Sequence, residues 1–158
     1  MLVTLRDGAR KSAGNGTEIE LPYAALFVRV AAKALEEPPS IRARLAGNEI
    51  RIPGRVNVGL AVDARQGLVV PVVRSSNMGR LKEIIDELMD LIQLAQIGKL
   101  LPDDLFAGTF TITNLGISEI DAFTLIIDPP QIAILGIGHI LPQPVAGNGK
   151  SGSATWPF

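Results

Sequence analysis

Two runs of mostly β-branched, apolar residues lie close together in the middle of this chain, and they limit the folds that are open to it. Val56–Val62 and Leu68–Val73 are separated by Asp63–Gly67, a spacing that predicts a β-hairpin with a five-residue loop. Both runs are apolar at nearly every position, which indicates that both faces of each strand are covered. Pro71 lacks an N–H group, which favours an edge or bulge position. The chain must therefore build a sheet with other elements packed over it.

Two further segments have helical periodicity. Tyr23–Leu35 follows Pro22 and is almost wholly apolar, which predicts a helix that is buried on most sides. In Leu81–Ala95, apolar residues recur three and four positions apart, and charged residues occupy many of the other positions. This pattern predicts an amphipathic helix that ends at Gly98.

Shorter segments predict the remaining elements. Gly47-Asn48 suits a tight turn between two short strands. The expected short strands and single helical turn are Ile41–Leu45, Glu49–Ile52, Thr109–Thr113 and Ile132–Ile140 for the strands and Pro102–Leu105 for the turn. Hairpins and helices without regular strand–helix–strand alternation place the chain in the α+β class, with a mixed α/β sheet flanked by helices.

Composition limits the core. Apolar residues make up 47% of the 158 residues but aromatic residues only 4%, so the core must be built from Ile, Leu, Val and Ala. The mean hydropathy of +0.29 is high for a chain of this length. An excess of aliphatic surface favours burial of some faces between subunits, and we expect a homo-oligomer.

Charge and residue types exclude several functions. The 15 basic and 16 acidic residues give a net charge of −1 without a basic block, which argues against nucleic acid or an anionic membrane as the main partner. The chain has no cysteine, so it has no disulfide, no thiolate nucleophile and no cysteine-ligated zinc site. Charged residues soon follow Met1-Leu2-Val3, and no uninterrupted apolar run approaches the ~18 residues of a membrane span. These features predict a cytoplasmic protein.

The run Gly108–Gly116 carries the strongest functional signal. Threonine and aromatic residues form a strand pattern that stops abruptly at Asn-Leu-Gly, which leaves the Thr113 hydroxyl and the Asn114 amide at the strand end. Both groups can donate hydrogen bonds to negative charge that develops on a substrate. Twelve residues later the sequence continues with Asp128–Gln131 and then the apolar stretch Ile132–Gly138.

Four motifs follow one another in a specific order: Val56–Asp63, Gly67–Val73, Gly108–Gly116 and Pro129–Gly136. Each motif is a weak signal by itself, but the four together, within a segment order that runs from residue 6 to residue 140, are specific. In this respect the chain resembles the catalytic domain of the dihydrolipoamide acyltransferase component of 2-oxoacid dehydrogenase complexes. The resemblance implies the fold of chloramphenicol acetyltransferase.

The resemblance also implies a chemistry. Members of this family are trimers whose active site is a channel between subunits, entered by coenzyme A from one end and by dihydrolipoamide from the other. A histidine in a His-x-x-x-Asp-Gly motif removes the thiol proton, and the thiolate attacks the thioester carbonyl. By position, Thr113 is the hydroxyl that stabilises the resulting oxyanion. The family needs no metal, and its lipoyl group is carried on a separate domain, which together with the other components of the complex is an expected partner.

Three further residues match positions on or near the coenzyme A channel. Arg6 suits a phosphate, although it is equally well explained as a solvated arginine near the chain end. Asp63 is either a ligand contact or only a turn residue. Asn114 is either a coenzyme contact or the residue that holds the turn after the strand.

The sequence also departs from the family. Its single histidine, His139, lies in the predicted strand Ile132–Ile140 and not in a His-x-x-x-Asp-Gly motif, which is absent from the 158 residues. A strand-end or interface role for His139 is the plainer interpretation. We therefore interpret residues 1–142 as a truncated catalytic core, impaired by the loss of its histidine, and residues 143–158 as a disordered tail. A frameshift in the gene would explain both.

Two functional interpretations stay open at this point. The first is the acyltransferase core, with acetyl, succinyl and branched-chain acyl groups all compatible with its motifs. The second is a non-catalytic oligomeric assembly or binding module that retains the scaffold without performing the transfer. A small-molecule-binding domain outside this family is the third and most generic alternative.

Overall fold

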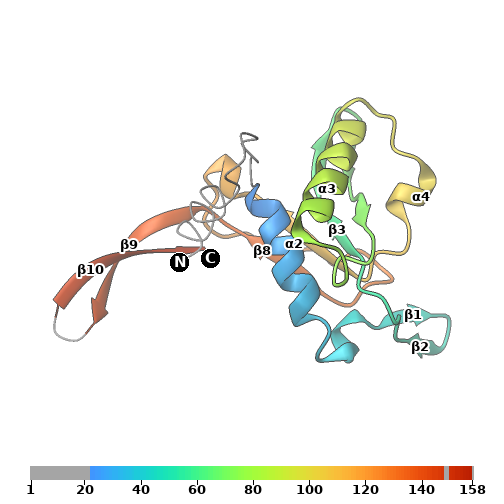
Figure 1. Ribbon diagram of the computed structural model, residues 1–158, viewed down its shortest axis with the longest axis horizontal. Helices are drawn as coiled ribbons and strands as arrows, with labels where there is room; N and C mark the ends of the chain where they lie inside the picture. Colours follow the sequence, from blue (N-terminus) through green and yellow to red (C-terminus); the bar gives the residue numbers. More distant parts are fainter. Residues whose placement is uncertain (1–21, 148–149, 158) are drawn as a thin grey trace. The chain divides into compact units, whose positions relative to one another are not determined.

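The computed structural model describes residues 22–147 and 150–157 (Figure 1). The chain divides into two compact units. The larger unit contains residues 22–113 and 125–135, and the described part of the smaller unit contains residues 114–124, 136–147 and 150–157. Arg6 lies outside the described residues. No helix in the described part of the chain is long and apolar enough to cross a bilayer.

A four-stranded mixed sheet forms the centre of the larger unit. Its strands, in spatial order, are β6 (Val72–Val73), β3 (Val58–Leu60), β7 (Phe110–Asn114) and β8 (Ile134–Ile137), with only the first half of β8 in this unit. Strand β3 pairs antiparallel with β6 and parallel with β7. The edge position of β6, directly after Pro71, agrees with the expectation that the proline lies near a sheet edge.

The predicted central hairpin is confirmed, with a shorter loop than expected. Strands β4 (Val62–Ala64) and β5 (Gly67–Val69) form a separate antiparallel pair, so only Arg65-Gln66 connects them. The expectation that all of this segment is covered is right for β3, which is buried throughout, and wrong for β5, where Leu68 is 73% exposed. The apolar pattern of β5 therefore reports β-propensity and not burial.

Both predicted helices are confirmed. Helix α2 (Tyr23–Ala34) and helix α3 (Leu81–Gln96) pack against each other (Figure 1). Helix α2 also contacts β3, and α3 contacts β6 and β4. Gly98, with φ +67°, lies just beyond the end of α3, in the left-handed conformation that glycine adopts without strain.

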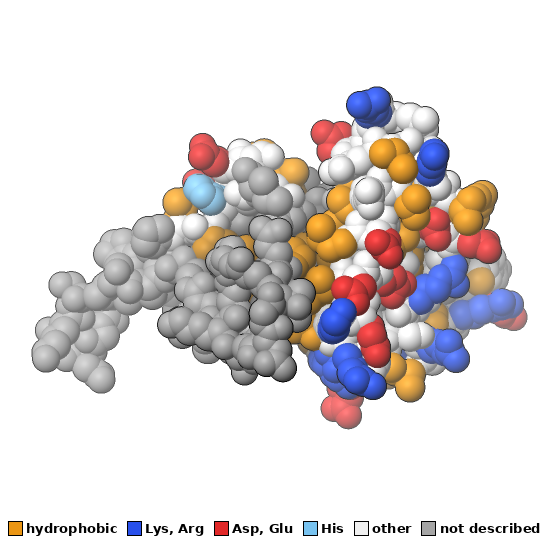
Figure 2. Space-filling view, turned by 45° about the horizontal axis from the view of Figure 1, so that its top comes forward, with side chains coloured by type: hydrophobic (Ala, Val, Ile, Leu, Met, Phe, Trp, Pro, Cys, Tyr) orange, Lys and Arg blue, Asp and Glu red, His pale blue; other side chains and the backbone are white. Residues whose placement is uncertain are grey.

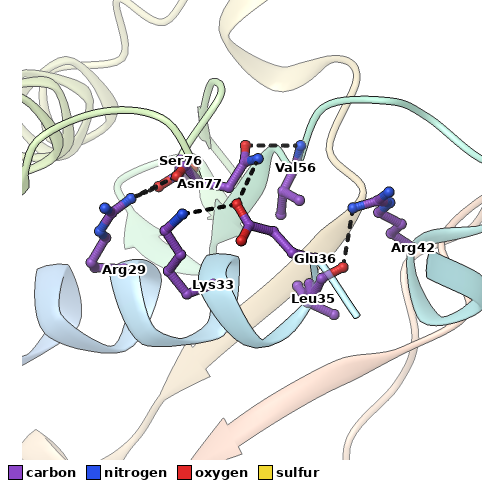
Figure 3. Close-up of polar contacts among 8 residues, drawn as sticks. All are labelled: Arg29, Lys33, Leu35, Glu36, Arg42, Val56, Ser76 and Asn77. Atoms are coloured by element: carbon purple, nitrogen blue, oxygen red, sulfur yellow. Dashed lines mark hydrogen bonds and ion pairs between the residues drawn. The ribbon is translucent and has the colours of Figure 1, made fainter. Parts of the chain in front are cut away.

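Polar contacts fasten α2 to the segment that follows β6 (Figure 3). The Arg29 guanidinium donates to the carbonyl oxygens of Ser76 (3.0 Å) and Asn77 (2.9 Å). The Glu36 carboxylate accepts from Lys33 (2.9 Å) and from the Asn77 amide (3.2 Å). These hydrogen bonds hold the pKa of Glu36 below its ordinary value of 4.5, with the Lys33 bond the larger cause.

A short hairpin follows α2, and its beginning differs from the expectation. Residues Pro39–Arg42 form a 3-10 helix, η1, where the strand Ile41–Leu45 was predicted to begin. A proline in the first position and the Ala43 N–H bond to the Ser40 carbonyl (3.1 Å) favour this turn. The paired strands that come next are β1 (Arg44–Ala46) and β2 (Glu49–Arg51).

Two short elements flank β7. Helix α4 (Pro102–Leu105) is the single helical turn that the sequence predicts, and its N-terminus is closed by the Asp104 carboxylate, which accepts from the Leu101 N–H (2.8 Å). A second 3-10 helix, η2 (Gly116–Ser118), follows β7.

The smaller unit corrects two expectations about the C-terminal part of the chain. The predicted strand Ile132–Ile140 is interrupted, because β8 ends at Ile137, and a Cβ at Gly138 would collide with the Asp121 carbonyl. The predicted disordered tail differs from the structure, which has an antiparallel pair of β9 (Ile140–Gly147) and β10 (Lys150–Pro157). The intervening Asn-Gly sequence is the strongest short hairpin signal, and it outweighs the scattered prolines.

Candidate functional site

The site is built at the end of β7. Along this strand, alternate residues share one face, so Thr109, Thr111 and Thr113 form a row of hydroxyl groups. The intervening Phe110 and Ile112 are buried and belong to the core. A row of three identical polar side chains on a central strand needs an explanation for each hydroxyl, because an unpaired buried hydroxyl is costly.

Two of the three hydroxyls have partners. The Thr109 hydroxyl donates to the Asn57 carbonyl (3.0 Å) and accepts from the Asn57 N–H (3.0 Å). The Thr111 hydroxyl donates to Oε1 of Gln131 (2.8 Å). Both threonines are 1% exposed. Thr113 is half-buried, and no residue in the described part of the chain hydrogen-bonds to its hydroxyl, so this group is free to meet a ligand.

The parallel pairing of β3 with β7 brings the segment of Asp63 to the same end of the sheet. Leu60 is in register with Ile112, and the Ala61 N–H donates to the Ile112 carbonyl (2.8 Å). Thr113 thus follows β7 where Asp63 follows β3, at the carboxyl ends of two adjacent parallel strands. In open α/β sheets this is the edge at which ligands bind.

Asp63 itself is exposed and borders an open depression. The depression has a volume of about 490 Å³ and is lined by Asp63, Ala64, Arg65, Gln96 and Ile97. These residues come from the β4–β5 hairpin and from the end of α3. The depression therefore offers one carboxylate, one guanidinium and one amide to a polar ligand.

Asn57 fixes the start of β7, and sequence reasoning did not single it out. Its amide donates to the Ala107 carbonyl (2.9 Å), and its carbonyl oxygen accepts from the Ser75 N–H (2.9 Å). Ser75 and Ala107 both have left-handed backbone conformations, with φ +47° and +69°. Such conformations are costly for residues other than glycine and persist where surrounding contacts hold them. The available signal was a polar residue inside an otherwise apolar motif.

Gln131 fixes the middle of β7, and it was noted only as part of a motif. Its side chain is 8% exposed and bonds to Thr111, as described above. The absence of a side chain at Gly108 makes room for it, since a Cβ there would lie 3.1 Å from Nε2 of Gln131. A glutamine directly after two prolines and before an apolar strand was the available signal.

In the smaller unit, Asn114 does hold a turn. Its Oδ1 accepts from the Gly116 N–H (3.0 Å), which is the turn role considered for this residue. His139 lies between β8 and β9, with Nδ1 3.8 Å from Oδ1 of Asp121, too far for a hydrogen bond. Neither residue has been placed against a ligand.

The described residues hold no cluster of three or more His, Cys, Asp or Glu that could bind a metal ion. The chemistry available at the end of β7 is therefore that of hydrogen-bond donors and of the charged groups near Asp63. Such groups suit a reaction in which an oxygen gains negative charge.

The fold and the site define a class of protein: an α+β acyltransferase core of the chloramphenicol acetyltransferase type. The sequence profile described as "2-oxoacid dehydrogenases acyltransferase (catalytic domain)" matches residues 1–155. The chain belongs to this family. The fold class and the family predicted from the sequence are confirmed.

Individual relatives give the same result. The dihydrolipoyllysine-residue succinyltransferase component of the 2-oxoglutarate dehydrogenase complex from Azotobacter vinelandii is 38% identical over 132 residues, which are 84% of this chain and 33% of that protein. The crystal structure of a probable dihydrolipoamide acetyltransferase from Listeria monocytogenes has a TM-score of 0.86 at 31% identity, covering 96% of this chain and 65% of that one. The cubic core of the pyruvate dehydrogenase multienzyme complex has a TM-score of 0.80 at 33% identity, covering 98% and 61%. The chain thus spans about a third of the length of the curated relative.

Proposed function

We propose that this chain provides the acyltransferase core that moves an acyl group between dihydrolipoamide and coenzyme A. The observation that carries the proposal is the position of Thr113. Its hydroxyl is the only one of the three in the β7 row without a partner in the described part of the chain, and it lies at the carboxyl end of a parallel strand. A hydroxyl so placed donates to the oxyanion that forms when a thiolate attacks a thioester.

Thr113 supplies half of the chemistry. A threonine hydroxyl stabilises the oxyanion but does not remove a thiol proton, because its pKa lies far above neutral pH. The family's base is a histidine in a His-x-x-x-Asp-Gly motif, and the 158 residues contain only His139, in a different context. Transfer by these residues alone is therefore impaired, and full activity requires an imidazole from another source.

The coenzyme contacts are part of the same proposal. Asp63 and Arg65 border the depression at the β4–β5 hairpin, where the Arg65 guanidinium suits a phosphate and the Asp63 carboxylate suits an amide or hydroxyl donor. Arg6 and the free amide nitrogen of Asn114 complete the set of contacts inherited from the family. Lipoamide reaches the site on a separate lipoyl domain, and neither substrate requires a metal.

The proposed assembly is a homotrimer, or a multiple of three, within a cytoplasmic dehydrogenase complex. The solved relatives include the core of a multienzyme complex, which supports an oligomeric state for this chain. Exposed aliphatic side chains in the larger unit, such as Ile126 (88% exposed) and Leu45 (61%), support burial against other subunits.

The test is an acyl-transfer assay with free dihydrolipoamide and a panel of acetyl-, succinyl- and branched-chain acyl-coenzyme A, with and without added imidazole as an external base. Replacing Thr113 by Ala is expected to lower turnover by about 100- to 1,000-fold, because it removes one oxyanion donor. Thr113→Ser, which keeps the hydroxyl, is the matched control and retains most of the turnover.

The same assay decides the second candidate function, a non-catalytic assembly or binding module. The lack of a His-x-x-x-Asp-Gly motif in the 158 residues favours that alternative. Turnover equal in the native chain and in Thr113→Ala, with every acyl donor and with imidazole present, would show that Thr113 has no catalytic role and leave the inert scaffold as the function.

A further inference from the structure

The β1–β2 hairpin is an isolated element of the larger unit. Its strands pair only with each other, and one backbone hydrogen bond, from the Leu45 N–H to the Pro130 carbonyl (3.4 Å), links them to the segment after β7. A two-stranded hairpin is marginally stable in water unless it packs on something else. The hairpin therefore needs a covering surface.

One face of this hairpin is apolar and exposed. Leu45 lies directly opposite Ile50 in the register, and the two side chains are 61% and 75% exposed. Ile52, two residues beyond Ile50 and so on the same side, is 51% exposed. Directly opposed apolar side chains in a strand pair are about 5 Å apart, so these residues form a contiguous patch.

The same hairpin is basic. Arg44 lies directly opposite Arg51, an arrangement that is destabilising for like charges unless an anion lies beside them. Arg51 has the Glu49 carboxylate as a partner (3.2 Å), but Arg44 and Arg55 have no side-chain partner among the described residues. We refer to Arg44, Leu45, Ile50, Arg51, Ile52 and Arg55 as the hairpin surface.

The larger unit also carries a patch of opposite charge around α4. Leu101, Leu105 and Phe106 are 63%, 41% and 67% exposed, although all three are large and apolar. Asp103 and Asp104 lie between them and are exposed. We refer to residues Leu101–Phe106 as the α4 surface. In the space-filling view, exposed hydrophobic side chains lie beside both basic and acidic groups (Figure 2).

From these two surfaces we infer that the β1–β2 hairpin of one copy docks on the α4 surface of a second copy. Three aliphatic side chains with three arginines face three apolar side chains with two aspartates, so both burial and charge are complementary. The two surfaces consist of different residues, so the contact is head-to-tail, the type that closes into rings. The inference rests on the proposed oligomeric core and names the surfaces that hold it together.

The absence of cysteine from the chain allows a clean cross-linking test. Two full-length single variants, Ile50→Cys and Phe106→Cys, are prepared with tags of different mass, mixed, and treated with a short bismaleimide. A head-to-tail contact gives the mixed dimer in clear excess over either homodimer. Leu68→Cys is the matched control, because Leu68 is equally exposed, at 73%, but belongs to neither surface.

Two cross-linking outcomes overturn the inference. Homodimers of Ile50→Cys in excess mean that two hairpins face each other. A mixed dimer no more abundant than that of Ile50→Cys with Leu68→Cys means that the hairpin meets another part of the copy or a different partner.

A second variant separates this inference from the proposed function. Leu45→Thr with Ile50→Thr keeps strand-forming residues but removes the apolar patch, and it is expected to lower the particle mass in sedimentation while the circular dichroism spectrum stays native. A native mass in that variant also overturns the inference, although it leaves the proposed trimer and the role of Thr113 intact. High salt weakens the contact if the arginines and aspartates contribute to it.

Discussion

Thr109, Thr111 and Thr113 are the same residue type on the same face of one strand, yet they have different roles. Asn57 takes up the hydroxyl of the first and Gln131 that of the second, and both of these threonines are buried. The third lies at the strand end and is half-buried without a partner in the described part of the chain. Environment, not residue identity, separates a structural hydroxyl from one available to a ligand.

This difference predicts a difference in stability. Thr111→Val leaves Oε1 of Gln131 buried and unpaired, and we expect a loss of about 1–3 kcal/mol in the free energy of unfolding. Thr113→Val, the same change two residues later, is expected to stay within about 0.5 kcal/mol because no described partner is lost. Urea denaturation of the two variants measures both values.

A double variant tests the cause. Combining Thr111→Val with Gln131→Leu removes both partners, so the combined loss should be smaller than the sum of the single losses. Strictly additive losses, or equal losses for Thr111→Val and Thr113→Val, would contradict the assignment of the Thr111–Gln131 bond as the constraint on β7.

At the scale of elements, α2 is held by a mixture of apolar packing and polar contacts. Ala25, Val28 and Ala32 are fully buried, as the apolar sequence of the helix predicts. The bonds of Arg29 and Glu36 to the segment 76–77 add direction to this packing, because hydrogen bonds fix position where apolar contacts tolerate sliding (Figure 3).

Glu36 makes this attachment sensitive to acid. The hydrogen bond from Lys33, and then that from Asn77, lower the pKa of the carboxyl below 4.5, so the folded state binds the proton less tightly than the unfolded state. The resulting stabilisation is present above about pH 4.5 and is lost as the pH falls through the lowered pKa. Glu36→Gln should therefore flatten the decline of stability below that pH.

The measurement is urea denaturation as a function of pH. Glu37→Gln is the control, because Glu37 has no hydrogen bond or ion pair with any described residue. An unchanged acid limb in Glu36→Gln would show that the contacts of this fully exposed carboxylate do not contribute, as is common for surface ion pairs.

For the whole molecule, the exposed aliphatic residues predict association. Ile126, Ile50 and Leu101 are 88%, 75% and 63% exposed, more aliphatic surface than a small monomer usually presents. We expect sedimentation equilibrium of the purified chain to give three times the 16.8 kDa chain mass, or a multiple of that. A stable monomer at all concentrations would contradict the proposed channel between subunits.

Periodicity and turn chemistry located most elements before the structure was known. Helices α2 and α3 begin within a residue of the predicted starts, and Gly98 ends the second helical segment as expected. The errors have local causes. At Pro39–Arg42 a 3-10 turn replaces the beginning of a strand, and at Gly138 the close approach of the Asp121 carbonyl breaks one.

The candidate site was only partly accessible to sequence reasoning. Thr113, Asp63 and Asn114 were identified through motifs, and their roles toward ligands stay predictions, as does that of Arg6. Asn57 and Gln131 were not singled out, because the importance of a buried polar residue depends on what lies opposite it. Periodicity describes neighbours along one element and carries no information about such pairs.

The sequence by itself determined the family, the order and type of most elements, and the residues that end β7, because all of these are encoded in spacing along the chain. Only the tertiary structure decided which hydroxyl of the β7 row is free. The partners that occupy the other two come from 52 and 20 residues away, and contacts over such separations exist only once the chain has folded.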